Sequence, residues 1–453
     1  MNKQADLLHG SIPRQMLQLG IPLLLSGLLQ SLYGITDMII VGQTLGSTGL
    51  SGVSMGSQIM QIVTTFSIGL STGGSVLISQ NIRRADNTEL RRILGTLTTL
   101  FLIVSISLAV IMVSPFGNFL LRVFRTPQMA MAQASGYLRI CSIGIPLIFA
   151  YNIISGVLRG MGNTRFAFYI ALVSAVLNVG LDLLFVPVLK MGAAGSALAT
   201  VLAQGIAAGG MLLYMLKIGS PMIPRRREEF HMDHQYLKML LKVGIPAGTQ
   251  GMVVFLSMLV VVGMINVHGM TVSAAYGACM KVDGLSILPR QAIAQASAVM
   301  VGQCFSVSDY KRVSRTVLYA AAMSFAVCIL MGAIVWLLAP QLVHLFDNDA
   351  AVIAEGCRYL RINVWGYPIV GLMGAFNSLT IGIGFTAFAL TNSFLDSIIA
   401  RILLCRILGS SMGLEGIYLG LVLAPICAAV IGCSYFLLGR WRKRPSLTAD
   451  RSK

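Results

Sequence analysis

The stretch YLRICSIGIP at residues 137–146 recurs as YLRINVWGYP at residues 359–368. Three further pairs of segments match in the same order at a separation of about 222 residues: LGIP (19–22) with VGIP (243–246), ISQNIRRAD (78–86) with VGQCFSVSD (301–309), and MGAAGSALATVLA (191–203) with MGLEGIYLGLVLA (412–424). Apolar helices use few residue types, so a single match could arise by chance. Four matches in order at nearly constant separation indicate that the chain is an internal duplication.

Both halves are strongly apolar. Hydrophobic residues make up 56% of the 453 residues and charged residues only 11%, which leaves too little polar surface for a water-soluble protein of this length. About twelve apolar runs are each long enough to cross a hydrocarbon layer of roughly 30 Å as a helix. These windows are 15–41, 52–79, 93–116, 136–158, 166–188, 194–216, 239–265, 274–301, 316–339, 359–381, 385–408 and 416–438. We predict an all-α integral membrane protein with about twelve transmembrane helices in two parallel-repeat six-helix bundles.

The distribution of positive charge predicts the orientation of the chain. The formal net charge is +17, and about 23 of the 33 Lys and Arg residues fall at the N-terminus, in the even-to-odd loops and in the tail RWRKR (440–444). This asymmetry is the positive-inside pattern, so we expect a multi-pass protein of the cell membrane with both termini cytoplasmic. Basic and aromatic residues do not alternate anywhere as they would on a nucleic-acid surface, so no nucleic-acid partner is expected.

The duplication and the charge pattern together suggest the domain organisation. We expect an N-terminal six-helix lobe over 1–217, a cytoplasmic linker rich in proline and charge over 218–236, a C-terminal six-helix lobe over 237–439 and a basic cytoplasmic tail over 440–453. Parallel repeats of this kind are typical of transporters whose halves rock to expose a central cavity to either side in turn.

Two carboxylates lie inside predicted spans of the first half: Asp37 in YGITDMIIVG and Asp182 in LNVGLDLLF (177–185). An acid in the middle of a membrane costs roughly 2.5 to 3.5 kcal/mol on insertion scales, so such a residue suggests a function. Asn178 precedes Asp182 by one helical turn and shares its face. The group could take up a proton near neutral pH or, with a hydroxyl added, hold a small hard cation such as Na⁺. The alternative is that either acid only hydrogen-bonds a neighbouring helix.

The sequence argues against an enzyme and against a nucleotide-driven machine. A membrane-embedded enzyme would need a catalytic set such as a His-rich metal cluster, a Ser-Lys pair or an aspartyl dyad on facing helices. The five histidines all lie in predicted loops or termini, and no P-loop occurs. The eight cysteines are scattered among apolar neighbours without a metal-ligand spacing, so we expect them to be buried small hydrophobic residues.

The paired halves, the first-helix acid, the N-x-x-x-D of the fifth helix and the run MGAAGSALATVLAQ in the sixth resemble the multidrug and toxic compound extrusion (MATE) transporters over about residues 10–440. The resemblance implies a cation-coupling site in the N-terminal lobe, formed by Asp37, Asn178, Asp182 and Thr200. It also places Pro22 at a position where the first helix can bend, although a proline at a helix N-terminus would need no bend.

Some members of that family have essential acids in the seventh and tenth helices, and this chain has none there. The departure favours coupling through the first half. The second half has its own charges. The resemblance places KVDG on the eighth helix facing the cavity, where Asp283 could contact a cationic substrate or form a structural charge pair. Possible substrate-cavity residues are Tyr33, Lys281, Asp283, Arg290 and Asn377; for Asp396 and Arg401 we favour a structural pair.

The expected function is secondary active efflux of organic cations or drugs by H⁺- or Na⁺-coupled antiport, with alternating access between two lobes and no cofactor beyond the coupling ion. A monomer in the lipid bilayer, with small organic cations as its partners, is expected. The alternative is a lipid-linked oligosaccharide flippase of a related superfamily, for which Lys281, Arg290 and Arg401 could supply cationic groups for a pyrophosphate.

Overall fold

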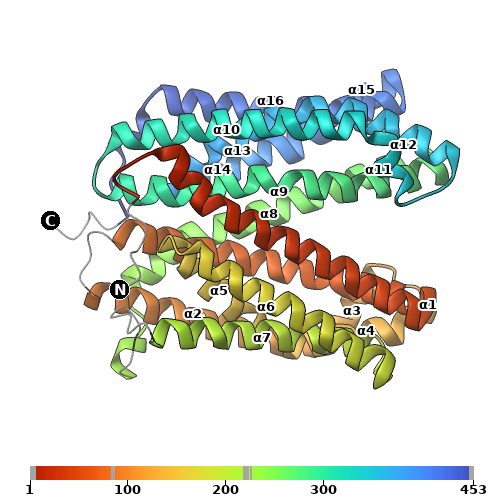
Figure 1. Ribbon diagram of the computed structural model, residues 1–453, viewed down its shortest axis with the longest axis horizontal. Coiled ribbons are helices and arrows are strands. Elements are labelled where there is room, and N and C mark those ends of the chain that lie inside the picture. The colour runs from red at the N-terminus through yellow and green to blue at the C-terminus, as the bar shows by residue number, and fades with distance from the viewer. Residues whose placement is uncertain (1–6, 83–86, 218–223, 225–226, 448–453) are drawn as a thin grey trace. The chain divides into compact units, whose positions relative to one another are not determined.

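The computed structural model (Figure 1) describes residues 7–82, 87–217, 224 and 227–447. These residues form helices and connecting turns, and no strand occurs among them. Eight of the helices are long and apolar enough to cross a membrane, or nine if one bent pair is counted as a single span. The prediction of an all-α integral membrane protein is confirmed.

The twelve predicted windows all fall on helices. The first two lie on α1 (Ile12–Asn81), which consists of two helices that meet at a kink at Gly46. Gly46 has φ 63° and ψ −160°, a conformation that side chains with a Cβ rarely adopt. The fourth window falls on α4 (Met131–Ile143) and α5 (Ile145–Gly160), a pair bent by 54°. The eight do not include α9 (Met270–Ser306), which carries the charges of MKVDGLSILPR.

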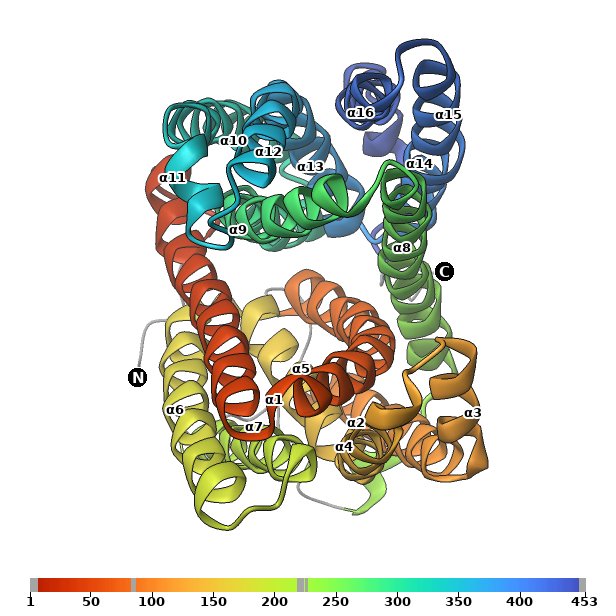
Figure 2. The same ribbon diagram turned by 90° about the vertical axis from the view of Figure 1, so that its right-hand side faces the viewer.

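The chain forms two compact units. Unit 1 contains Leu25–Gly248. Its elements are the greater part of α1, α2 (Asn87–Val113), α3 (Pro115–Val123), η1 (Gln128–Ala130), α4, α5, α6 (Thr164–Leu183), the π-helical turn η2 (Leu184–Val188), α7 (Ala193–Lys217), η3 (Arg227–Phe230) and the first half of α8 (His234–Asn266). Within it, α7 packs against α4, α5 and α6 (Figure 2).

Unit 2 contains the beginning of α1 up to Leu24 and the chain from Thr249 onward, as far as these residues are described. Its further elements are α9, α10 (Tyr310–Leu337), α11 (Ala339–His344), α12 (Ala350–Asn363), η4 (Val364–Gly366), α13 (Tyr367–Gly382), α14 (Thr386–Phe394), the π-helical turn η5 (Leu395–Ala400), α15 (Arg401–Met412), α16 (Leu414–Leu437) and η6 (Arg440–Lys443). Here α9, α10 and α13 pack on one another, and α13 and α15 pack on α16.

Two helices are shared between the units. Within α1 the assignment changes after Leu24, and within α8 it changes after Gly248. Both changes come two residues after a proline inside the helix, Pro22 in α1 and Pro246 in α8, and these prolines are paired by the LGIP and VGIP match. Because α1 begins at Ile12, Pro22 is an interior proline and not a helix N-terminal one. Each duplicated half therefore contributes the start of its first helix to the unit built mainly by the other half.

A glycine crossing holds the first half of α8 in unit 1. Gly69 and Gly73 lie one turn apart on α1, and Gly244 and Gly248 lie one turn apart on α8. A Cβ added at Gly69 would lie 2.1 Å from the Cα of Gly248, and one added at Gly73 would lie 2.9 Å from the carbonyl oxygen of Leu240. Small residues at this spacing allow two helix backbones to approach closely, which lets α8 dock on α1.

The corresponding crossing in unit 2 joins the beginning of α1 to α9. A Cβ at Gly20, the partner of Gly244 in the repeat, would lie 3.8 Å from the carbonyl oxygen of Ala292 and 4.0 Å from the Cβ of Ala296. Arg312 holds the preceding residues: its guanidinium donates to the carbonyl oxygens of Leu7 (2.9 Å) and Gly10 (3.2 Å) and to the Gln15 amide oxygen (2.7 Å). The start of α1 is thus fixed to unit 2 by both backbone packing and hydrogen bonds.

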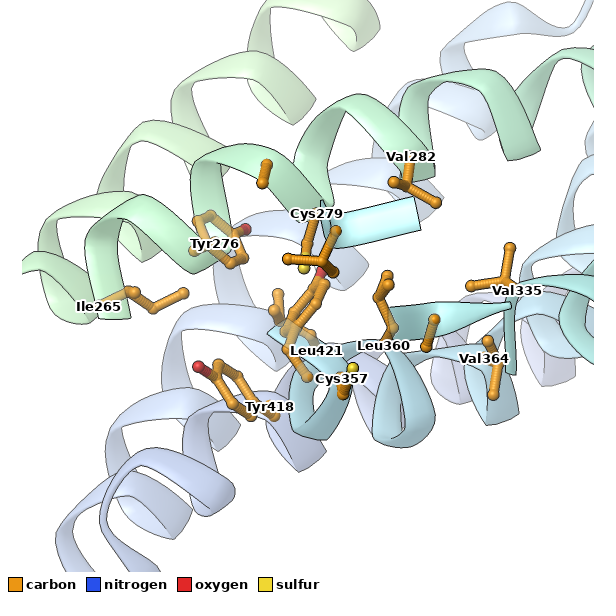
Figure 3. Close-up of a cluster of buried hydrophobic side chains, with 14 of the residues drawn as sticks. Ile265, Tyr276, Cys279, Val282, Val335, Cys357, Leu360, Val364, Tyr418 and Leu421 are labelled. Atoms are coloured by element: carbon orange, nitrogen blue, oxygen red, sulfur yellow. The ribbon is translucent and has the colours of Figure 1, made fainter. Parts of the chain in front are cut away.

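The largest side chains of one core in unit 2 come from α9, α12 and α16. Figure 3 shows Tyr276, Cys279 and Val282 of α9 facing Leu360 of α12 and Tyr418 of α16. Six of the eight cysteines are buried and two are half-buried, all as free thiols. The expectation of cysteines packed as small hydrophobic residues agrees with this burial.

We predict that Gly69→Ala destabilises the protein. The new methyl group would meet backbone atoms, which cannot move aside by a rotamer change, so α1 and α8 must separate at a cost of about 1 to 3 kcal/mol. Thermal unfolding in detergent, followed by circular dichroism, measures the effect. Gly209→Ala on α7 is the matched control, because nothing lies within 4 Å of its added Cβ; equal unfolding temperatures for the two variants would contradict the prediction.

Candidate ion-coupling site

Three helices of unit 1 bring the predicted coupling residues together. Asp37 lies on α1, Asn178 and Asp182 lie on α6, and Thr200 lies on α7. The α6 helix is capped at its beginning by Asn163, whose side chain accepts from the Phe166 amide. It packs along α7 and changes to a π-helical turn, η2, directly after Leu183. Turns of this kind are frequent at functional sites.

The side chains form two bonded pairs. The Ser196 hydroxyl on α7 donates to Asp37 Oδ1 over 2.6 Å, and Asn178 Nδ2 donates to Thr200 Oγ1 over 3.3 Å. The Asp182 carboxyl lies beside that of Asp37, close enough for a hydrogen bond between them when one carries a proton. The structure therefore places all four predicted residues in one cluster and adds Ser196 to it.

Several oxygens of this cluster have no hydrogen-bond donor. Asp182 is 0% exposed and Asn178 is 2% exposed. Among the described residues nothing donates to either carboxylate oxygen of Asp182 or to Oδ1 of Asn178. A buried carboxylate without a donor is costly, and it needs a proton, a cation or water to satisfy it. Carboxylate, amide and hydroxyl oxygens are also the ligands preferred by hard cations, so the chemistry of the cluster fits either H⁺ or Na⁺.

Tyr33 lies one turn before Asp37 on α1, half-buried, and its hydroxyl interacts with Gln204 one turn beyond Thr200 on α7. The polar strip between α1 and α7 therefore continues by at least one turn beyond the carboxylates. Tyr33 was predicted as a residue of a substrate cavity, and that role stays a prediction.

The other predicted cavity residues belong to unit 2, where Asp283 is fully bonded. The hydroxyls of Tyr359 and Tyr367 donate to its two carboxylate oxygens over 2.8 and 2.5 Å, and Asn363 Nδ2 donates over 2.9 Å. Arg290 interacts with this carboxylate electrostatically, but within the described chain the two form no ion pair shorter than 4.0 Å. Three neutral donors and one more distant cation stabilise this acid.

Lys281 and Asn377 lie in different surroundings. Lys281 is exposed on α9. Asn377 on α13 is 6% exposed, and its Oδ1 accepts from Asn392 of α14 over 3.3 Å. The same Asn392 amide also donates to the carbonyl oxygen of Ala428 on α16 over 3.0 Å. Asn377 thus takes part in a link between three helices of unit 2.

Asp396 and Arg401 form the ion pair that we favoured from the sequence. Arg401 Nη2 donates to Asp396 Oδ2 over 3.0 Å, and the two side chains are 9% and 2% exposed. The Ser397 hydroxyl donates to the same oxygen over 3.1 Å. Asp396 and Ser397 lie inside the π-helical turn η5, and Arg401 begins α15 directly after it.

Sequence reasoning missed Ser196 in unit 1 and the three donors around Asp283 in unit 2. Ser196 precedes Thr200 by one helical turn, so it shares the face that was assigned to the coupling site. That spacing could have identified it. Tyr359, Asn363 and Tyr367 recur at a helical spacing of four, but their shared direction depends on the tertiary packing of α12 against α9.

The fold and this site define a class: a multi-pass helical membrane transporter built from two duplicated halves. The family model named MatE matches residues 22–184 and again residues 246–407, one match in each half. The chain belongs to this MatE family.

Relatives of the chain are similar over nearly their whole length. It is 28% identical over 447 residues to "Probable multidrug resistance protein YpnP" of Bacillus subtilis, covering 97% of this chain and 98% of the relative. It is 24% identical to "Probable multidrug resistance protein NorM" of Thermotoga maritima, covering 98% and 96%. The structure of a MOP superfamily transporter from Pyrococcus furiosus aligns with a TM-score of 0.92 at 22% identity, covering 98% and 100%, and so shows the same fold.

We predict that Arg401→Gln destabilises unit 2 by about 3 to 5 kcal/mol, because Asp396 would remain buried without its cation. The double variant Asp396→Asn with Arg401→Gln should recover most of the loss, since both charges are then absent. Thermal unfolding of the wild type, the single variant and the double variant in one detergent gives the comparison. A single variant as stable as the wild type would show that the pair contributes no stability.

Proposed function

We propose that the protein exports organic cations or drugs by secondary active transport, coupled to the inward flow of H⁺ or Na⁺ through the cluster of Asp37, Asn178, Asp182, Ser196 and Thr200. Its family and the names of its relatives support efflux of small molecules. On this proposal the chain works as a monomer in the cell membrane with cytoplasmic termini, needs no cofactor beyond the coupling ion, and is not an enzyme.

The observation that carries the proposal is the state of Asp182. It is fully buried, lies beside a second carboxyl group and has no donor to either oxygen within the described residues. Two buried carboxylates in contact repel each other unless a positive charge lies between them. Loading H⁺ or Na⁺ removes that repulsion and unloading restores it, so occupancy of the cluster can change how α1 packs against α6 and α7.

The bonding of the buried acids in the second half supports coupling through the first half. Asp283 already has three donors, and Asp396 has an arginine. Neither acid needs an exchangeable cation to be stable inside the protein. Asp182 does, and it is therefore the acid that we assign to coupling.

Pro22 is a point in α1 at which this change of packing can alter the direction of the helix. Proline removes one backbone hydrogen bond of a helix and weakens it locally, and α1 passes from unit 2 into unit 1 two residues later. We propose that loading of Asp37 alters the tilt of α1 beyond this point.

The surroundings of the basic residues on which the flippase alternative depends do not favour it. It rested on Lys281, Arg290 and Arg401 as a set of cationic groups. Arg401 is bonded to Asp396, and Arg290 lies in the field of Asp283. Lys281 is exposed, and it forms no ion pair with an acid in the described part of the chain.

We predict that Asp182→Asn abolishes ion-driven efflux. The amide keeps the shape of the side chain but cannot bind and release a cation through a change of charge. The measurement is ethidium efflux from inverted vesicles or cells, with a pH gradient and a Na⁺ gradient imposed separately. We expect the wild type to export under one of the gradients and the variant to fall to the rate of vesicles without the protein.

Glu415→Gln is the control for this experiment, because it neutralises an acid that is exposed at the start of α16. It should export as the wild type does. Size-exclusion chromatography checks that each variant is folded. Gradient-driven export by a folded Asp182→Asn variant at the wild-type rate would remove Asp182 from the mechanism.

We also predict that Asp182→Asn abolishes the dependence of the unfolding temperature on pH or on Na⁺ concentration. A cation that binds only the folded protein raises the unfolding temperature with its concentration. Unfolding of detergent-solubilised protein, followed at several pH values in NaCl and in KCl, should show one dependence in the wild type, on pH or on Na⁺. Asp182→Asn should lose that dependence, whereas Thr200→Val should weaken it only if Na⁺ is the ion, since the hydroxyl is a ligand for Na⁺ but not a proton acceptor in the cluster.

A further inference from the structure

A groove of about 530 Å³ lies in unit 2 at the end of α16, and none of the acids considered above lines it. Phe388 of α14 and Val430 and Tyr435 of α16 line its wall, and Leu438 follows the end of α16. The rings of Phe388 and Tyr435 are stacked at 4.5 Å. Val430 is 57% exposed and Leu438 is 66% exposed. Apolar side chains exposed on a spanning helix face acyl chains, so the wall of this groove is a hydrocarbon surface.

The other end of the groove is strongly cationic. Arg440 and Arg444 line it, both are exposed, and neither forms an ion pair with a carboxylate of the described residues. The Arg444 guanidinium lies over the ring of Phe385 at 3.2 Å from its centroid. Tyr435 also lines the groove, and its buried hydroxyl has no hydrogen-bond partner in the described chain. Two guanidinium groups without an ion-pair partner among the described residues therefore lie beside the apolar wall.

The chain holds these arginines in fixed positions. Gly439 adopts φ 65° and turns the chain at the end of α16 into η6. Trp441, 0% exposed, anchors the turn, because its indole N–H donates to the carbonyl oxygen of Phe436 over 3.1 Å and its ring stacks on that of Phe436. Arg440 and Arg444 therefore flank an anchored residue and do not belong to a freely moving basic tail.

We infer that this groove binds an acidic glycerophospholipid, with its phosphate at Arg440 and Arg444 and its acyl chains along Val430 and Leu438. Guanidinium groups bind phosphate by paired hydrogen bonds, and basic pockets between spanning helices are typical sites for anionic lipid headgroups. The apolar wall continues from the cationic end, as acyl chains continue from a headgroup. The inference depends on the membrane location of the chain and not on the proposed transport.

The test measures lipid retention and not transport. Purified protein in detergent is equilibrated with phosphatidylglycerol or with phosphatidylcholine, and bound lipid is counted by native mass spectrometry. We expect one phosphatidylglycerol molecule to be retained in preference to phosphatidylcholine. Arg440→Gln with Arg444→Gln should weaken its binding about 25-fold, because each cationic residue near an anionic lipid contributes about fivefold.

Arg442→Gln with Lys443→Gln is the matched control. It removes the same charge from the same turn, but neither residue lines the groove. It should retain phosphatidylglycerol much better than the first double variant; equal loss in both would show that the tail attracts anionic lipid only through its overall charge and would overturn the site.

Two further measurements test the apolar part. Ser434→Trp would fill the groove with both arginines intact, so it should also lose phosphatidylglycerol, and unchanged retention would place the lipid elsewhere. Millimolar glycerol 3-phosphate should not displace the lipid, because it has no acyl chain; efficient displacement would make the groove a phosphate site and refute the lipid. Unfolding temperatures confirm that each variant is folded.

Discussion

A hydrocarbon environment offers no water to a polar group, so each backbone and side-chain donor or acceptor must find its partner inside the protein. Most of this chain obeys that constraint locally. The hydroxyls of Thr44, Ser142 and Ser286 each donate to the carbonyl oxygen four residues earlier in their own helices. The buried oxygens without a donor among the described residues include both carboxylate oxygens of Asp182, Oδ1 of Asn178 and Oδ1 of Asp396. Within the described chain Asp182 is the buried acid with neither carboxylate oxygen bonded, and on the proposed function a proton or a cation satisfies it.

The duplication produced two similar scaffolds whose buried acids have different bonding partners. In unit 2, two tyrosines and an asparagine donate hydrogen bonds to Asp283. Arg401, the first residue after η5, forms an ion pair with Asp396. In unit 1, Asp182 faces another carboxyl group. Both units carry a π-helical turn in the corresponding span, η2 and η5, and in both a buried acid lies in or just before it. The second half thus serves as an internal comparison: in the same architecture, Asp283 has three donors and Asp396 is paired with an arginine through one of its two oxygens.

The helices could be predicted from the sequence because each membrane span requires a long apolar run. The repeat could be predicted because four pairs of motifs match in order. Helical spacing also predicted that Asn178 and Asp182 share a face, whereas the grouping of Asp37 and Thr200 with them came from the family resemblance. Sequence reasoning did not predict which unit the start of α1 joins, because that depends on the crossing of Gly20 with α9. Nor could it show that Asn377 bonds to Asn392, since the face of a polar residue on an apolar helix is set by its neighbours in the fold.

The shared helices have a consequence for biosynthesis. The residues of α1 before Leu24 pack against Ala292 and Ala296 and are held by Arg312, all of which leave the ribosome after most of the chain has been made. Unit 1, in turn, lacks the first half of α8 until the second repeat begins. Neither unit can therefore complete its packing from one repeat alone, and the first helix to enter the membrane is among the last to reach its final contacts. The helices of this fold therefore do not reach their final packing in the order in which they are synthesised.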